Sequence, residues 1–110
     1  MYFPTDVSQG EVVAIRARGR LNMLTAPRLS RTIRSTMAGG ATRIALDLSE
    51  VESLDSSAIG AIIAGMTATR AEGGDLRLVA PGPQPSLVLE LTHLDRVLLS
   101  FASVEATWAA

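Results

Sequence analysis

Segments with two different hydrophobic periods alternate along the chain, and this alternation constrains the fold more than any other feature. Apolar side chains occupy every second position, as in strands with one buried face, in residues 11–19, 42–51 and 75–81. The three- and four-residue spacing of amphipathic helices appears between them, in residues 22–40 and 57–74. Because a helix between two strands usually connects parallel neighbours, the pattern predicts one α/β domain over the whole chain.

The ends of the chain add shorter elements to this prediction. Residues 82–94 begin with turn prolines and continue as a short helix, residues 95–101 have the composition of a strand, and Ser103 is a candidate cap for a last helix. Residues 1–8 are a candidate edge strand. The expected fold is therefore a mixed β-sheet of four to five strands with about four helices packed on it. Within it, Gly19 is expected to end the first long strand.

The first long helix has recognisable boundaries. Thr25 is the expected N-cap, Pro27 is tolerated in the first helical turn, and Gly39 and Gly40 end the helix. The apolar positions lie four residues apart and face the core, whereas three arginines occupy the opposite side: Arg28, Arg31 and Arg34.

Composition argues against several kinds of site. The chain has no cysteine, so it can form neither a disulfide nor a thiolate metal site. His93 is its only histidine, and neither a P-loop nor a GxGxxG segment is present. A phosphoacceptor of receiver type at Asp47 would normally need an acidic pair and a later lysine, and the chain has no lysine. We therefore expect no catalytic residue, no metal and no cofactor.

Charge is unevenly distributed. Residues 1–43 carry seven arginines and two acids, a net charge of +5, while residues 44–110 carry three arginines and nine acids, a net charge of −6. These charges are either solvated faces or a polarised protein-binding surface. The pI of about 5.7 and the absence of aromatic residues among the arginines argue against nucleic-acid binding.

The N-terminus and the apolar runs suggest where the protein acts. No apolar run approaches the roughly 18 residues that a membrane span requires. The first residues lack the basic and then apolar pattern of a signal peptide. Together with the absence of cysteine, these features predict a cytoplasmic protein without a membrane span.

An acidic residue and two hydroxyls, Asp55, Ser56 and Ser57, directly precede the second long helix. The first N–H groups of a helix are unpaired and carry partial positive charge, so one of the three can serve as the N-cap. The same position favours a phosphate group. The residues themselves leave both possibilities open.

This second helix carries two stripes at helical spacing. The apolar stripe, expected to face the core, contains Ile59, Ile62, Ile63 and Met66. The other stripe contains only small residues: Ser57, Ala61, Ala64 and Ala68. Small residues either allow another helix of the domain to approach closely or form a flat surface for a partner protein.

Three segments together resemble the STAS domain, and most closely the bacterial anti-sigma factor antagonists. They are "GRLNMLTA" (residues 19–26), "LDLSEVESLDSSAIG" (46–60) and "LELTHLDRVLLSFASVEAT" (89–107), and they occur in the order and spacing of that family. The second segment is similar to the family's signature "LDLS…V…DSSGLG". The resemblance implies one STAS domain over residues 1–110.

The resemblance also implies a function and its residues. In this family the unphosphorylated antagonist binds an anti-sigma factor that is also a serine kinase, and so frees a sigma factor. The kinase phosphorylates the serine after the motif's aspartate, here Ser56, and a phosphatase reverses the reaction. Asp55 would orient the loop and Ser57 would be the neighbouring cap. The chain would thus be a substrate and a ligand rather than an enzyme, and a monomer or weak dimer.

The implied partner-binding residues surround the acceptor serine. They are Asn22, Thr25, Asp55, Ser56, Ser57, Ala58, Ala61 and Ala64. Two of them depart from the family pattern, since Ala58 replaces a common glycine and Asn22 a common aspartate. An alternative implied by the resemblance is a STAS subunit that docks on another complex, such as an ABC lipid-transport system or a sensor scaffold, without phosphorylation.

Overall fold

Five strands form one sheet in the order β1-β2-β3-β4-β5. The computed structural model describes residues 2–4 and 12–108. The strands are β1 (Tyr2–Pro4), β2 (Val13–Leu21), β3 (Arg43–Leu54), β4 (Asp75–Val79) and β5 (Ser100–Phe101). β1 runs antiparallel to β2, and the four strands from β2 to β5 are parallel. The predicted mixed α/β sheet is therefore present, and the candidate edge strand in residues 1–8 corresponds in its described part to β1.

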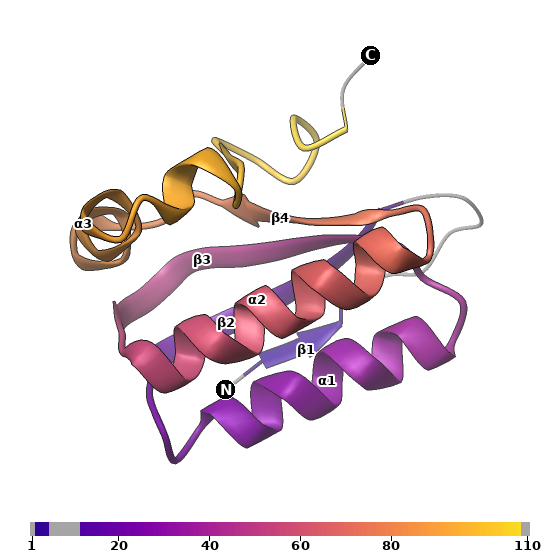
Figure 1. Cartoon of the computed structure of the whole chain (residues 1–110), viewed down its shortest axis with the longest axis horizontal. Helices are drawn as coiled ribbons and strands as arrows, with labels where there is room; N and C mark the ends of the chain where they lie inside the picture. The colour runs from indigo at the N-terminus through magenta and orange to yellow at the C-terminus, as the bar shows by residue number, and fades with distance from the viewer. Residues whose placement is uncertain (1, 5–11, 109–110) are drawn as a thin grey trace.

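Three α-helices connect the parallel strands within the described residues. They are α1 (Ala26–Ala38), α2 (Ser56–Ala71) and α3 (Pro83–Leu91), followed by a 3-10 helix, η1 (Leu94–Arg96). Figure 1 shows α1 and α2 lying side by side along one face of the sheet, with the C-terminal segment on the other side of β4. α3 lies at the end of the sheet where α2 begins.

The core fills the space between the sheet and the α1–α2 layer. The inward positions of β3 expected from the sequence, Ile44, Leu46 and Leu48, are fully buried. They pack with Ile33 of α1 and Ile62 of α2 in one aliphatic cluster. Of the predicted apolar stripe on α2, Ile63 alone is only partly buried. Burial of these side chains is the main favourable contribution to folding.

Gly19 does not end β2. The strand continues to Leu21. Its register with β3 shifts twice near Gly19, once between Arg16 and Arg18 and again between Gly19 and Arg20. Gly19 has a φ of +74°, which a glycine adopts readily, so it lies within an irregularity of the strand. The extension matters because it carries the chain from β2 to the same end of the sheet as the start of α2.

The C-terminal part differs most from the prediction. The expected strand over residues 95–101 is η1 followed by a β5 of two residues. The helix expected after Ser103 is absent in the described residues, which form turns up to Trp108. The reason is a competing tertiary contact, since the Thr107 carbonyl accepts a hydrogen bond from Nη1 of Arg77 on β4. The prediction of about four helices is thus too high by one α-helix.

Candidate functional site

Asp55 caps α2. It precedes the first helical residue with extended backbone angles, and its Oδ1 accepts a hydrogen bond of 3.0 Å from the Ala58 N–H. Ser57 already lies inside the first helical turn, so the expectation that Ser57 would be the cap is wrong. The aspartate accepts the hydrogen bond from the otherwise unpaired N–H group at the helix end, so neither serine is needed as the cap.

Ser56 and Ser57 are both exposed. Neither hydroxyl forms a hydrogen bond within the part of the chain that the structure describes. Attaching a phosphate to the Ser56 hydroxyl would therefore break no hydrogen bond within the described part of the chain. The hydroxyl is also accessible to another protein.

The loop between β2 and α1 is held by its own side chains. The Asn22 Oδ1 accepts hydrogen bonds from the N–H groups of Leu24 (2.9 Å) and Thr25 (3.3 Å), which closes a turn. The Thr25 hydroxyl accepts a bond from the Asn22 N–H (2.9 Å) and donates one to the Arg20 carbonyl (3.0 Å). Thr25 thus occupies the predicted N-cap position, but its hydroxyl braces the loop and does not cap the helix.

This loop and the start of α2 are joined through the backbone. The Asp55 N–H donates to the Leu21 carbonyl at 3.1 Å, beside the β2–β3 pairing of Leu21 with Leu54. From α3, the Gln84 side chain accepts from the Leu54 N–H at 2.8 Å and donates to the Leu54 carbonyl at 3.2 Å. The structure therefore brings Asn22, Thr25, Asp55, Ser56 and Ser57 to one end of the sheet.

Two exposed apolar residues at this end were missed by the sequence analysis. Met23 is 67% exposed and Leu24 is 85% exposed, and both lie in the loop that starts after Leu21. The sequence analysis placed them just before the expected N-cap, Thr25, and gave them no role, although Asn22 before them is a typical first residue of a turn. Exposed apolar side chains at the same end of the sheet as an accessible serine suit a protein-binding surface. Gln84, which holds this end of the sheet together, was missed as well.

The small-residue stripe of α2 is divided between the interior and the surface. Ala61 is 7% exposed and lines the space between α1 and α2 together with Ala64 and Ala68. Ser57 and Ala64 are exposed. The stripe therefore faces α1 from a buried position at Ala61, whereas Ser57 and Ala64 remain open to solvent.

Ala58 is 0% exposed, because its methyl group packs into the aliphatic cluster. The expectation that the Ala58 side chain contacts a partner is wrong for this conformation, since the domain itself covers it. The small exposed part of Ala61 lines the space between α1 and α2. The methyl group by which Ala58 differs from the glycine of the family pattern is accordingly buried in the core and not on the surface.

Charged groups gather at the other end of α2. The Asp75 carboxylate accepts hydrogen bonds from Nε of Arg70 (2.8 Å), Nε of Arg77 (3.1 Å) and the Leu76 N–H (2.9 Å). Burial on its own raises the pKa of Asp75, but these hydrogen bonds outweigh burial and hold the pKa below its ordinary value. This cluster stabilises the fold and lies far along α2 from the serines.

The remaining candidate residues have structural environments. Asp47 accepts a hydrogen bond from the Ser49 N–H (2.9 Å) and lies 3.8 Å from Nε of Arg16. His93 is exposed, in a turn with a φ of +61°. Within residues 2–4 and 12–108 no group of three or more acidic, histidine or cysteine side chains could hold a metal ion. None of the helices in this part of the chain is long and apolar enough to cross a membrane.

Comparison with known proteins gives consistent matches. A family model described as the STAS domain matches residues 3–107. A Thermotoga maritima protein described as a candidate anti-sigma factor antagonist is 37% identical over 65 residues, which are 59% of this chain and 58% of that protein. The chain therefore aligns with less than two thirds of this curated relative.

Solved structures match over a longer part of the chain. The crystal structure of an antagonist candidate from Thermotoga maritima has a TM-score of 0.85 and 28% identity, and the match covers 94% of this chain and 88% of that one. The Bacillus anti-sigma factor antagonist SpoIIAA, solved in unphosphorylated and phosphorylated forms, has TM-scores of 0.81 and 0.74. These matches cover 96% of this chain and 92% and 96% of SpoIIAA. The identities of 24% and 23% support the shared fold alone.

Proposed function

This chain belongs to the STAS domain family, and we propose that it is a cytoplasmic anti-sigma factor antagonist that works as a partner switch. In its unphosphorylated form it binds an anti-sigma factor that is also a serine kinase, and a sigma factor is released. Phosphorylation of Ser56 ends the binding, and a phosphatase restores it. The chain acts as ligand and substrate, and no catalytic residue is assigned to it.

The observation that carries this proposal is the state of Ser56. It is the first residue of α2, it is exposed, and Asp55 rather than Ser56 performs the capping. The serine hydroxyl is consequently available to a kinase without any rearrangement of the helix end. The candidate anti-sigma factor antagonists among the relatives are consistent with this role.

The docking surface that we infer combines the start of α2 with the β2–α1 loop. Met23 and Leu24 provide exposed apolar side chains, whereas Asp55, Ser56 and Ser57 provide a polar edge. A surface of apolar anchors with a polar rim is the common arrangement in protein–protein interfaces. Asn22 keeps the apolar pair in place through its turn, and an amide oxygen accepts these hydrogen bonds as a carboxylate oxygen would.

A phosphate on Ser56 would change this surface by charge. It adds about −1.5 to −2 units next to the Asp55 carboxylate, in a surface that otherwise buries apolar side chains against the partner. Burying a charge without a matching partner is costly, so the complex is weakened. The helix N-terminus meanwhile tolerates the phosphate, so the domain itself remains folded.

Binding of the cognate anti-sigma serine kinase by charge variants tests this proposal. Ser56→Asp should lower the affinity by about tenfold or more, equivalent to about 1.4 kcal/mol, with an unchanged circular dichroism spectrum. Ser57→Asp, one residue away, is the matched control and should have a smaller effect. Equal affinities of the wild type and Ser56→Asp would contradict the proposed switch.

A further inference from the structure

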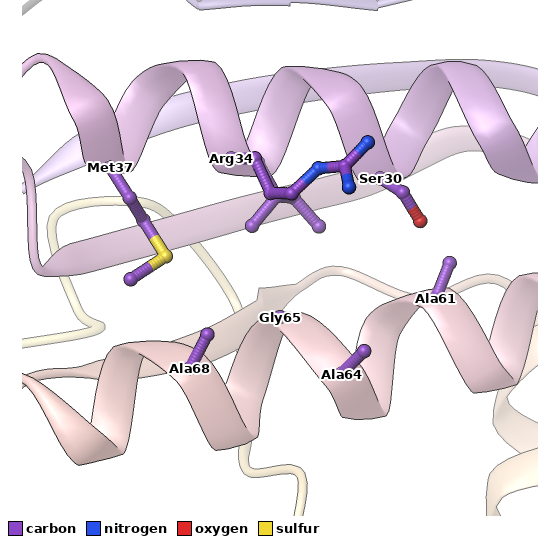
Figure 2. Close-up of a pocket in the computed structure, with 8 residues that line it drawn as sticks. Ser30, Arg34, Met37, Ala61, Ala64, Gly65 and Ala68 are labelled. Atoms are coloured by element: carbon purple, nitrogen blue, oxygen red, sulfur yellow. The ribbon is translucent and has the colours of Figure 1, made fainter.

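A groove of about 180 Å³ runs along the surface between α1 and α2. Figure 2 shows its two walls facing each other. The side chains that line it include Ser30, Arg34 and Met37 from α1 and Ala61, Ala64 and Ala68 from α2. The alanines are too short to fill the space between the helices. The groove is therefore narrow and mostly apolar, with one guanidinium group on its α1 wall.

The α1 wall has positive charge that the described part of the chain does not neutralise. α1 carries Arg28, Arg31 and Arg34 and no acidic residue, and all three arginines are exposed. None of them forms an ion pair within residues 2–4 and 12–108, where the ion pairs involve other arginines. Arg34 lines the groove, and Arg31 lies one helical turn away on the outer side.

The acidic group at the groove lies at one end. Glu72 follows α2 and, together with Arg34, lines the continuation of the groove toward the C-terminal ends of both helices. The half formed by Ser30, Ala61 and Ala64 has no acidic lining residue. Electrostatic complementarity therefore favours a ligand whose negative charges lie over this half.

Size and surface chemistry favour a protein segment over a membrane. A cavity of about 150 Å³ is known to hold a benzene molecule, so this groove has room for one or two aliphatic side chains. Helices that bind membranes expose large apolar or aromatic side chains. The exposed large apolar residues in the described part of the chain lie outside α1 and α2: Met23, Leu24, Leu87, Leu91, Val97 and Leu99.

We propose that the α1–α2 groove docks an acidic amphipathic helix of a partner protein. Small aliphatic side chains of that helix would enter the groove between the alanines, and its carboxylates would pair with Arg34 and Arg31. Helix-in-groove binding uses such spaced anchors, and arginine binds carboxylates through two parallel hydrogen bonds. None of Asp55, Ser56 and Ser57 lines the groove, so this contact does not depend on the proposed phosphorylation.

Fluorescence anisotropy with a labelled synthetic peptide tests the docking. The probe is a helical peptide of about 18 residues with alanine and leucine on one face and glutamates flanking them. Wild-type protein should bind it saturably and more weakly at higher salt, and a scrambled peptide of the same composition should not bind. Absence of saturable binding, or equal binding of the scrambled peptide, would overturn the proposal.

Two variants locate the binding in the groove. Arg34→Glu should reduce the affinity about tenfold or more, whereas Arg18→Glu, the same charge change on the exposed side of β2, should leave it nearly unchanged. Ala64→Leu should also weaken binding by filling the groove from an exposed position. Equal effects of the two charge variants would contradict a site in the groove. If the protein bound phosphatidylglycerol vesicles through Arg34 but did not bind the peptide, the ligand would be a membrane. That result would also overturn the proposal of a docked helix.

Discussion

The two ends of α2 are built in opposite ways. At its start, one hydrogen bond from the Ala58 N–H to Asp55 closes the helix, and Ser56 and Ser57 stand exposed. After its end, Asp75 is buried and accepts three hydrogen bonds, and the backbone at Gly74 packs against Thr42. A chemical change is tolerated at the first end because few interactions depend on it. The second end anchors the helix on β4, so the same domain can carry an adjustable surface and remain folded.

The greatest expected loss of stability comes from closing the space at the anchored end. In Gly74→Ala, the new methyl group would overlap the Thr42 carbonyl oxygen. We expect a loss of about 3 kcal/mol in the free energy of unfolding, measured by urea denaturation. Gly39→Ala is the control, since its methyl group would make only contacts of 3.4 Å or longer. Similar losses in both variants would mean that the backbone near Thr42 adapts and that this end is not a tight anchor.

Asp75→Asn removes the carboxylate charge on β4 that pairs with Arg70 of α2 and with Arg77 of β4. The expected loss is about 1–2 kcal/mol at neutral pH, because water around the partly exposed Arg70 screens its ion pair with Asp75. The pKa of Asp75 is lower in the folded protein, so its contribution is complete above the ordinary aspartate pKa and is lost as the pH falls through the folded value.

Urea unfolding at several pH values should therefore show the wild type and Asp75→Asn approaching each other in acid. Parallel pH profiles of the two proteins would contradict the role given to this carboxylate. Arg77 also stacks on Trp108, with its guanidinium carbon 4.2 Å from the ring centroid, so near-ultraviolet circular dichroism can follow whether the C-terminal segment detaches.

A smaller loss is expected at the adjustable end. Asp55→Ala removes the cap of α2 and should cost about 1 kcal/mol, whereas Ser57→Ala should change the free energy of unfolding by less than about 0.5 kcal/mol. Thermal unfolding of the two variants measures the difference. A larger loss for Ser57→Ala than for Asp55→Ala would show that the serine, not the aspartate, closes the helix.

Gly60→Ala should stabilise the protein slightly. An added Cβ at this exposed α2 position meets no heavy atom within 4 Å apart from its chain neighbours and the backbone of its own helix, and alanine has the higher helix propensity. We expect a gain of about 0.5–1 kcal/mol and a rise of a few degrees in Tm. A lower Tm would show that the adjustable end is packed more tightly than its exposure indicates.

The sequence predicted the parts of this fold that depend on local periodicity. The buried positions of β3 and most of those of α2 follow from spacing alone, because each element has one face turned to the aliphatic core. The sequence analysis placed the end of the strand at Gly19, where the structure has an irregularity within the strand. Both situations use a glycine with a positive φ, so the residue type alone does not distinguish them. The C-terminal turns were missed because a contact between Arg77 and the Thr107 carbonyl joins residues far apart in the sequence.

The site was predicted less completely than the fold. The resemblance brought Asn22, Thr25, Asp55, Ser56 and Ser57 into one group, and the structure places all five at one end of the sheet. Which of them caps α2 depended on where the helix begins, a boundary that the sequence pattern leaves uncertain by a residue or two. The exposure of Met23 and Leu24 depends on the turn that Asn22 closes, which hydrophobic periodicity does not contain.

Phosphate mapping after incubation with ATP and the cognate anti-sigma serine kinase tests the central claim most directly. The proposed switch predicts one phosphate, located on Ser56 by peptide mass spectrometry. It should be lost in Ser56→Ala, retained in Ser57→Ala, and accompanied by release of the kinase. Stable binding of the kinase without any phosphate on Ser56, or a phosphate on Ser57 instead, would contradict it.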